Sequence, residues 1–296
     1  MKIVTIIGAR PQFIKAAMVS LEIAKHKSID EVLVHTGQHF DENMSDIFFD
    51  QMNIPKPKYN LNVSGGNHGE MTGKMLIAIE LVLLEEKPDL VLVYGDTNST
   101  LAGALAASKL HIKVAHIEAG LRSFNFKMPE EQNRILTDNL STLLFCPTDT
   151  SLNNLMKEGV NHRKIHLVGD VMQDAAIHFS KLAKCPEDLN ITELENGFVL
   201  STIHRAENTD SKERLGQIVD AINEISNKIK VVLPLHPRTK AKLKEYGLEI
   251  SATVIDPVGY FEMLYLIDNS KIVISDSGGL QKEAFFFSKP CLTLRD

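Results

Sequence analysis

The chain begins Met1-Lys-Ile-Val-Thr-Ile-Ile-Gly8-Ala-Arg-Pro-Gln-Phe-Ile-Lys15. A run of β-branched residues ends at Gly8, and a segment of helical composition follows it. This order predicts a strand over Ile3–Ile7 that leads directly into a helix, as in an α/β fold. The apolar run is far too short for a signal peptide, so we interpret it as part of the folded core.

The same alternation continues to the other end of the chain. Between the apolar runs, residues such as Met71, Met75, Ile79 and Val82 recur at helical spacing and predict helices with one apolar face. Strands that are apolar almost throughout and alternate with helices predict parallel sheets covered on both faces. The eleven predicted strands are Ile3–Ile7, Val32–Thr36, Leu90–Tyr94, Val114–Ile117, Leu143–Cys146, Ile165–Val168, Phe198–Ile203, Val231–Leu235, Thr253–Ile255, Ile272–Ser275 and Cys291–Leu294.

A polar stretch at 184–197 divides this series into two. It contains Pro186 and precedes a fresh succession of strands and helices. We therefore expect two Rossmann-like domains, at 1–180 and 185–296, with a cleft between them. Because the chain ends directly after a predicted strand, we expect a final crossover helix beyond Asp296.

The composition excludes several classes of protein. With 44% hydrophobic residues, 32 Lys and Arg against 38 Asp and Glu, and a net charge of −6, the chain is neither disordered nor a non-specific nucleic-acid binder. Its three cysteines form no C-x-x-C pattern, so we expect reduced thiols in a cytoplasmic protein. Uninterrupted apolar stretches stay well short of a membrane span, and none is predicted.

Polar loops follow seven of the predicted strands. In open α/β sheets ligands bind beyond the carboxyl ends of the strands, so seven polar loops at this edge predict a substrate cleft. The loops are Gly8–Pro11, Gly37–His39, Gly95–Asn98, Glu118–Arg122, His204–Asn208, His236–Thr239 and Asp276–Gly279.

Two of these regions have the composition of an anion site. Ser277, Gly278 and Gly279 stand between a strand and a helix, where backbone N–H groups can approach a phosphate. The alternative is a helix N-cap with closely packed glycines. Arg10 and Lys15 flank the start of the first helix, where a cation opposes the helix dipole and an anion would explain it; the alternative is a solvated pair.

Carboxylates gather at the strand ends of the first domain. Asp96, Glu118, Glu130 and Glu131 lie at or beside these ends, with Arg134 near in sequence. Carboxylates that share a cleft can act as base and acid in one reaction. The alternatives are a helix cap for Asp96 and a favourable helix start for Glu130, whereas Glu118 ends an apolar strand and is harder to explain as structural.

Three further residues are candidates in the second domain. His204 and His236 each end a strand and can bind phosphate or sugar, although a lone histidine is more often structural. Glu283 follows Ser277 by six residues and can accept ribose hydroxyls, the alternative being a surface residue favoured by the helix dipole. Metal-ligand spacing and a Gly-x-Gly-x-x-Gly turn are both absent from the sequence, so we expect neither a metal nor a redox cofactor.

The motifs occur in one order that covers essentially the whole chain. Gly8–Lys15, Gly95–Thr97, Glu118–Arg122, Pro129–Arg134, His204-Arg205 and Asp276–Glu283 together resemble the non-hydrolysing UDP-N-acetylglucosamine 2-epimerases. The resemblance implies two Rossmann-like domains of the glycosyltransferase-B type with the active site in the interdomain cleft. It also implies a homodimer that needs no cofactor.

The resemblance assigns roles residue by residue. It implies Asp96, Glu118 and Glu130 as catalytic carboxylates, with His204 beside the reacting sugar. Such enzymes interconvert UDP-N-acetylglucosamine and UDP-N-acetylmannosamine by expelling UDP from C1 while a base removes the C2 proton, and then adding UDP back. The implied ligands of UDP are Arg10, Lys15, Arg134, His236, Phe261, Ser277, Gly278, Gly279 and Glu283.

The opening motif leaves the substrate open. Most such enzymes begin Gly-Thr-Arg-Pro-Glu, whereas this chain has Gly8-Ala-Arg-Pro-Gln12, as in branches that act on 2,3-diacetamido-uronic acids or 6-deoxy sugars. A UDP-sugar glycosyltransferase shares the expected fold, and it would require an acceptor. A hydrolysing epimerase would release free UDP, and a nucleotide-sugar sensor would bind without turnover.

Overall fold

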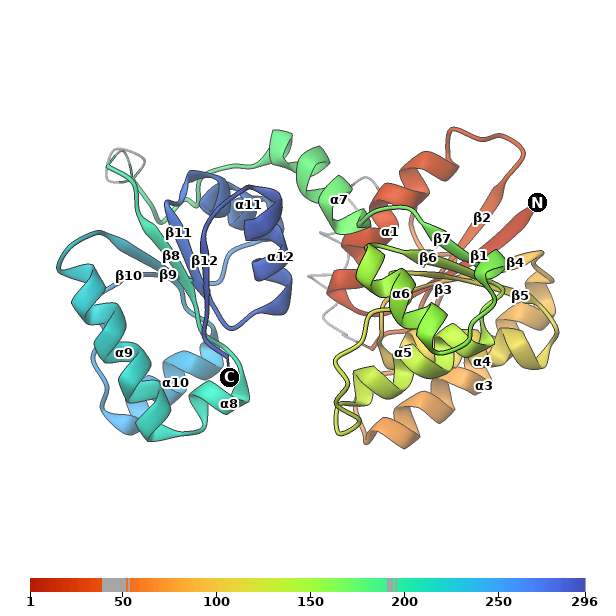
Figure 1. Cartoon of the computed structure of the whole chain (residues 1–296), viewed down its shortest axis with the longest axis horizontal. Helices are drawn as coiled ribbons and strands as arrows, with labels where there is room; N and C mark the ends of the chain where they lie inside the picture. The colour runs from red at the N-terminus through yellow and green to blue at the C-terminus, as the bar shows by residue number, and fades with distance from the viewer. Residues whose placement is uncertain (39–51, 53, 191–193, 195, 296) are drawn as a thin grey trace. The chain divides into compact units, whose positions relative to one another are not determined.

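The computed structural model describes residues 1–38, 52, 54–190, 194 and 196–295. The chain forms two compact units, Met1–Ala175 and Ala176–Asp296 (Figure 1). The division falls within helix α7 (Val171–Phe179), before the predicted boundary at 180–185. The reason is Phe179, whose ring packs 5.7 Å from that of Phe261, centroid to centroid, in the core of the second unit.

The first unit contains a parallel sheet in the order β3-β2-β1-β4-β5-β6-β7. From β3 to β6 this is the strand order of a Rossmann fold, in which the order of addition of strands reverses between β1 and β4. The strands are β1 (Lys2–Ile7), β2 (Asp30–His35), β3 (Tyr59–Asn60), β4 (Leu90–Tyr94), β5 (Lys113–Ile117), β6 (Leu143–Cys146) and β7 (Ile165–Leu167).

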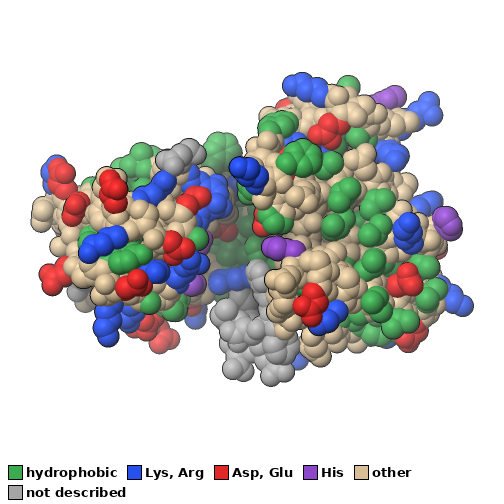
Figure 2. Space-filling view, turned by 90° about the horizontal axis from the view of Figure 1, so that it is seen from below, with side chains coloured by type: hydrophobic (Ala, Val, Ile, Leu, Met, Phe, Trp, Pro, Cys, Tyr) green, Lys and Arg blue, Asp and Glu red, His purple; other side chains and the backbone are tan. Residues whose placement is uncertain are grey.

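Helices cover both faces of this sheet (Figure 1). They are α1 (Arg10–Ile23), α3 (His68–Glu86), α4 (Asn98–Lys109), α5 (Pro129–Leu140), α6 (Asp149–Lys157) and the first part of α7, with a 3-10 turn at His162–Lys164. The apolar face predicted for α3 is correct, since Met75, Ile79 and Val82 are buried in the core. The other side of α3 is also apolar, and its Ile77, Leu81 and Leu84 are 51–67% exposed. Figure 2 shows hydrophobic side chains gathered on this unit.

The second unit repeats the plan in the order β10-β9-β8-β11-β12. Its strands are β8 (Val199–Thr202), β9 (Val231–Pro234), β10 (Thr253–Ile255), β11 (Ile272–Ser275) and β12 (Cys291–Thr293). One face packs on α11 (Tyr260–Asn269) and α12 (Gly278–Phe286), and the other on α9 (Lys212–Ser226) and α10 (Pro237–Tyr246). A short helix α8 (Ala206–Thr209) follows β8, and a 3-10 turn at Ser180–Leu182 follows α7.

The predicted fold class is confirmed: both sheets are parallel, and all eleven predicted strands are present within a few residues of their expected ends. Strand β3 is the exception that the sequence analysis missed. Among the described residues, no helix combines the length and apolar character needed to cross a membrane. His39, from one of the seven polar loops, lies outside the described residues. An active site between the two domains stays a prediction.

Candidate functional site

The turn after β1 is held in place by Gln12. Its Oε1 atom accepts hydrogen bonds from the N–H groups of Gly8 and Ala9 at 2.8 and 3.0 Å, and its Nε2 donates to the Tyr94 carbonyl of β4 at 2.8 Å. A Cβ atom at Gly8 would lie 2.0 Å from Thr36 Oγ1, so only glycine fits there. The sequence analysis gave Gln12 no role, although a Gln three residues after a helix cap is a known capping pattern.

The turn after β4 carries Asp96. Gly95 has φ +61° and donates its N–H to the Ile117 carbonyl of β5 at 3.0 Å. Asn133 Nδ2 donates to the Asp96 carbonyl at 2.9 Å, and Arg134 Nη2 donates to Asp96 Oδ2 at 2.5 Å. Helix α5 therefore holds Asp96 at its backbone carbonyl through Asn133 and at its carboxylate through Arg134.

Glu118 follows β5 in a conformation that residues with a Cβ rarely adopt. Its φ is +70°, and its carboxylate forms an ion pair with Lys15, both side chains being about 90% buried. Left-handed backbone at a non-glycine residue costs of order 1–3 kcal/mol and concentrates at functional sites. A Cβ at Gly95 would lie 3.2 Å from both charged groups, so the turn that carries Asp96 packs directly against the pair.

A pocket of about 180 Å³ opens at this edge of the sheet. Lys15, Asp96 and Glu130 all line it, whereas Glu118 is not part of its wall and meets it through Lys15. The structure thus brings together the predicted carboxylates of the first unit and one of the two predicted cations. Arg10, the other cation, is the first residue of α1 and is half-buried.

The two adjacent acids Glu130 and Glu131 have different surroundings. Glu131 is 1% exposed and accepts hydrogen bonds from the N–H groups of Ser123 and Phe124, each at 2.8 Å. Burial raises the pKa of Glu131, but these bonds and Arg134 outweigh it, so the pKa is below its ordinary value. Glu131 therefore builds the loop before α5. Glu130 makes no hydrogen bond or ion pair within the described residues and faces the pocket.

Arg134 was expected to bind UDP, and the structure gives it other partners. Its guanidinium donates to Asp96 and, at 2.8 Å, to Glu131. Burial lowers the pKa of Arg134, but the two carboxylates raise it above its ordinary value. Arg134 thus orients two acids of the first unit, and its predicted contact with UDP stays a prediction.

In the second unit the two predicted histidines lie together, with ring centroids 6.4 Å apart. His236 caps α10, and its Nδ1 accepts a hydrogen bond from the Arg238 N–H at 3.2 Å, which leaves the proton on Nε2. His204 Nδ1 lies 3.1 Å from Asp276 Oδ1, where only a protonated nitrogen avoids repulsion from the carboxylate. His236 therefore presents a donor at Nε2, and His204 presents an acceptor.

Burial also lowers the pKa of His204, an effect that the nearby Asp276 only partly offsets. Burial therefore favours the neutral imidazole of His204 over the imidazolium. Asp276 itself is fully buried and accepts hydrogen bonds from the backbone N–H groups of His204 and Arg205 at 3.0 and 2.9 Å. The sequence analysis quoted Asp276 in a motif and gave it no role, because its partners are about 70 residues away.

For the turn before α12, the alternative to an anion site was a helix N-cap with closely packed glycines, and only the N-cap is present. Ser277 is the N-cap, and its Oγ accepts from the Leu280 N–H at 3.3 Å. The glycines are not closely packed, since a Cβ at Gly278 or Gly279 would meet nothing described nearer than 3.7 Å. The first N–H groups of a helix lack partners within it, so this uncrowded helix end can accept an anion.

The remaining predicted residues of the second unit are buried. Glu283 is 7% exposed, so the surface alternative for it is wrong. Phe261 is also 7% exposed and packs against the rings of Phe179 and Tyr260. Its position is that of a core residue.

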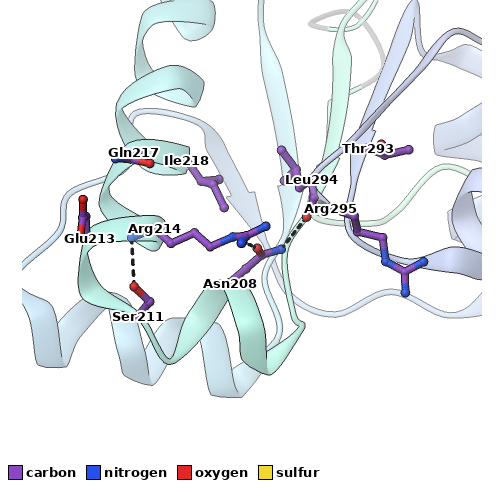
Figure 3. Close-up of a pocket in the computed structure, with 9 residues that line it drawn as sticks. All are labelled: Asn208, Ser211, Glu213, Arg214, Gln217, Ile218, Thr293, Leu294 and Arg295. Carbon is purple, nitrogen blue, oxygen red and sulfur yellow. Dashed lines mark hydrogen bonds between the residues drawn. The ribbon is translucent and has the colours of Figure 1, made fainter. Parts of the chain in front are cut away.

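A second pocket, of about 400 Å³, lies between the α8–α9 region and the end of β12 (Figure 3). Asn208 lies at its centre, accepting from Arg214 Nε at 2.7 Å and donating to the Leu294 carbonyl at 3.0 Å. Its Nδ2 also donates to Asp276. None of the predicted site residues lines this pocket. Asn208 of α8 instead holds Leu294, the residue after β12, by its hydrogen bond.

Known proteins place these features in one family. The family model described as UDP-N-acetylglucosamine 2-epimerase matches residues 21–296, nearly the whole chain. The chain belongs to the UDP-N-acetylglucosamine 2-epimerase family. Within the described residues, no group of three or more His, Cys, Asp or Glu side chains is arranged to hold a metal ion.

Relatives of this family differ in their named substrates. A UDP-2,3-diacetamido-2,3-dideoxy-D-glucuronate 2-epimerase of Pseudomonas aeruginosa is 61% identical over 100% of this chain and 84% of its own length. The crystal structure of Methanocaldococcus jannaschii UDP-GlcNAc 2-epimerase with UDP-GlcNAc and UDP is 49% identical, with TM-score 0.86 over 100% and 84% of the two chains. The Neisseria meningitidis enzyme bound to UDP-GlcNAc is 34% identical, with TM-score 0.87 over 100% and 83%.

Proposed function

We propose that this family member inverts C2 of a UDP-2-acetamido sugar, converting UDP-N-acetylglucosamine to UDP-N-acetylmannosamine. The observation that carries the proposal is the acid pocket of the first unit, where Asp96 and Glu130 line one wall and the Lys15–Glu118 pair meets it. Proton transfer at carbon needs more than one acid or base. Two carboxylates line this pocket, and Glu118 is paired with Lys15 in its wall.

The reaction proceeds by elimination and re-addition. A carboxylate takes the C2 proton, the electron pair of the C2–H bond forms a double bond to C1, and the C1–O bond breaks with its electrons leaving on UDP. UDP then adds back to C1 while a proton is delivered to the opposite face of C2. The base and the acid need different environments. Asp96 is paired with Arg134 and Glu118 with Lys15, whereas Glu130 has no cation beside it among the described residues.

The groups of the second unit hold the leaving UDP. The first N–H groups of α12, with Gly278 and Gly279, offer donors to a diphosphate, and His236 Nε2–H adds another. His204 presents a neutral acceptor to a sugar hydroxyl or amide. We propose that both sets bind the same UDP-sugar, because retaining UDP until it adds back is what separates epimerisation from hydrolysis.

A second substrate is favoured by one observation. The Pseudomonas aeruginosa relative, 61% identical, is named for UDP-2,3-diacetamido-2,3-dideoxy-D-glucuronate. The C2 chemistry is the same for both sugars, so the pocket carboxylates serve either substrate.

Proton NMR in D₂O tests the function directly. We expect one of the two UDP-sugars to yield its C2 epimer with deuterium at C2 and without stoichiometric release of UDP. The substrate that exchanges faster identifies the preferred sugar. Accumulating UDP would indicate hydrolysis, and turnover only with an added acceptor would indicate a glycosyltransferase.

The homodimer and the cytoplasmic location stay predictions. The exposed apolar side chains of α3 (Ile77, Leu81 and Leu84) form a surface that a second copy could cover. Analytical ultracentrifugation tests the dimer, which we expect to weaken when Leu81 is replaced by Asp.

A further inference from the structure

A buried chain of charged groups runs behind the acid pocket. His116 of β5 is fully buried, with Nδ1 2.7 Å from Asp138 Oδ1 and Nε2 2.7 Å from the Gly95 carbonyl oxygen. The other oxygen of Asp138 accepts from Arg122 Nη1 at 2.8 Å. Arg122 in turn makes two hydrogen bonds of 2.7 Å with Glu158, the residue that follows α6.

The Gly95 carbonyl determines which ring nitrogen of His116 carries a proton. A carbonyl oxygen accepts hydrogen bonds and cannot donate, so Nε2 must carry a proton to make the contact with Gly95. The contact between Nδ1 and Asp138 Oδ1, at 2.7 Å, holds the other side of the ring. The ring is therefore fixed at both nitrogens, with its Nε2–H directed at the Gly95 carbonyl.

His116 and its neighbour Ile117 together fix the Gly95 peptide. The Gly95 N–H donates to the Ile117 carbonyl, and the Gly95 carbonyl accepts from His116. Gly95 directly precedes Asp96, and His116 precedes Glu118 by two residues on the same strand. The position of Asp96 relative to Glu118 thus depends on one turn whose two polar groups are both held by β5.

We propose that His116, through its hydrogen bond to the Gly95 carbonyl, is a positioning residue that sets the separation of Asp96 and Glu118. This inference rests on the proposed function, in which both carboxylates take part. His116 acts on the turn through its hydrogen bond to the Gly95 carbonyl. Asp138 and Arg122 hold the ring in the orientation that reaches it.

Two conservative variants separate the contacts of His116. In His116→Gln the amide nitrogen can replace Nε2 and still donate to Gly95, whereas in His116→Asn it replaces Nδ1 and can donate only to Asp138. We expect kcat to fall about 100-fold in His116→Asn, as misplacement of catalytic groups by about 1 Å does, and much less in His116→Gln. The affinity for UDP should change less than about threefold in both.

A merely structural role would give a different pattern. Thermal unfolding would then follow the loss of Asp138 pairing, and His116→Gln would be the worse variant. Equal kcat values for the two variants, or a kcat of His116→Asn near that of the unsubstituted protein, would overturn the proposal.

Nitrogen-15 NMR of histidine-labelled protein supplies a test that needs no variant to fold and no turnover. We expect the His116 signals to show a proton on Nε2, hydrogen-bonded to the Gly95 carbonyl. A His116 ring without a proton on Nε2 would contradict this inference alone. Absence of exchange in any UDP-sugar by the unsubstituted protein would contradict the proposed function instead.

Discussion

The strand ends of the two units, each built on the same strand order, carry different kinds of polar group. In the first unit, the charged side chains bind one another: Lys15 holds Glu118, and Arg134 holds Asp96. In the second unit, Gly278 and Gly279 leave space at a helix end, and His236 directs an N–H outward. One edge fixes its own reactive groups, whereas the other keeps donors for a ligand. We therefore expect substitutions in the first unit to change turnover and those in the second to change binding.

Glu118→Gln provides the strongest test of this difference. The amide is not a base and cannot pair with Lys15 as a carboxylate does, so we expect kcat to fall by about 10³-fold or more. The affinity for UDP, measured by calorimetry, should stay within a few-fold. Glu22→Gln, at an exposed position of α1, is the control and should change neither quantity. Loss of UDP binding in Glu118→Gln would give Glu118 a structural role.

The adjacent pair Glu130 and Glu131 sharpens the comparison within the first unit. Glu130→Gln should lower kcat about 100-fold with little change in stability, because its side chain faces the pocket. Glu131→Gln should lower the free energy of unfolding by about 1–3 kcal/mol, because one of its buried carboxylate bonds to the loop is lost. Urea unfolding and steady-state kinetics on both variants check this. The opposite assignment of the two effects would contradict the proposed roles.

The sequence predicted the fold better than it predicted which acidic residues are structural and which face the pocket. Strands such as Leu90–Tyr94 are apolar throughout, and this continuous apolar run predicts a strand buried in a parallel sheet. Strand β3 has only two residues, Tyr59 and Asn60, which is too short for a periodic pattern. Its pairing with β2 arises from the tertiary structure.

The candidate site shows the same limit. Glu130 and Glu131 both suit a helix start, and only the loop that donates to Glu131 distinguishes them. Asp276 acquires its role through backbone N–H groups of His204 and Arg205, which are distant in sequence. Local patterns identify residue types at strand ends, whereas their partners depend on how distant loops meet.

Gly278→Ala tests the second unit. A methyl group there would meet Arg295 Nη1 at 3.7 Å, an ordinary contact, so the fold should be unaffected. If a diphosphate approaches this helix end, we expect the affinity for UDP to fall about tenfold, or about 1.4 kcal/mol. Gly216→Ala, inside α9 with similar space, is the matched control and should leave UDP binding unchanged. Unchanged affinity in Gly278→Ala would rule out the proposed phosphate position.

The amino-terminal edge of the first sheet offers a buried acid with no expected part in the reaction. Glu86 ends α3 and receives Lys2 of β1, Lys58 at 2.5 Å and the Tyr59 hydroxyl at 2.6 Å. Hydrogen bonds from Lys2, Lys58 and Tyr59 lower its pKa to about 2. Since the pKa is lower in the folded state, the stabilisation is complete above the unfolded value and is lost as pH falls from about 4.5 towards about 2. We expect Glu86→Gln to lower the free energy of unfolding by about 1–2 kcal/mol at neutral pH. That difference in unfolding free energy should disappear as the pH falls through about 2. The kcat of the variant should stay unchanged. Urea unfolding across this pH range measures it, with Glu22→Gln at an exposed position of α1 as the control. A loss of kcat in Glu86→Gln would mean that turnover does not depend on the carboxyl-end groups of the first unit alone.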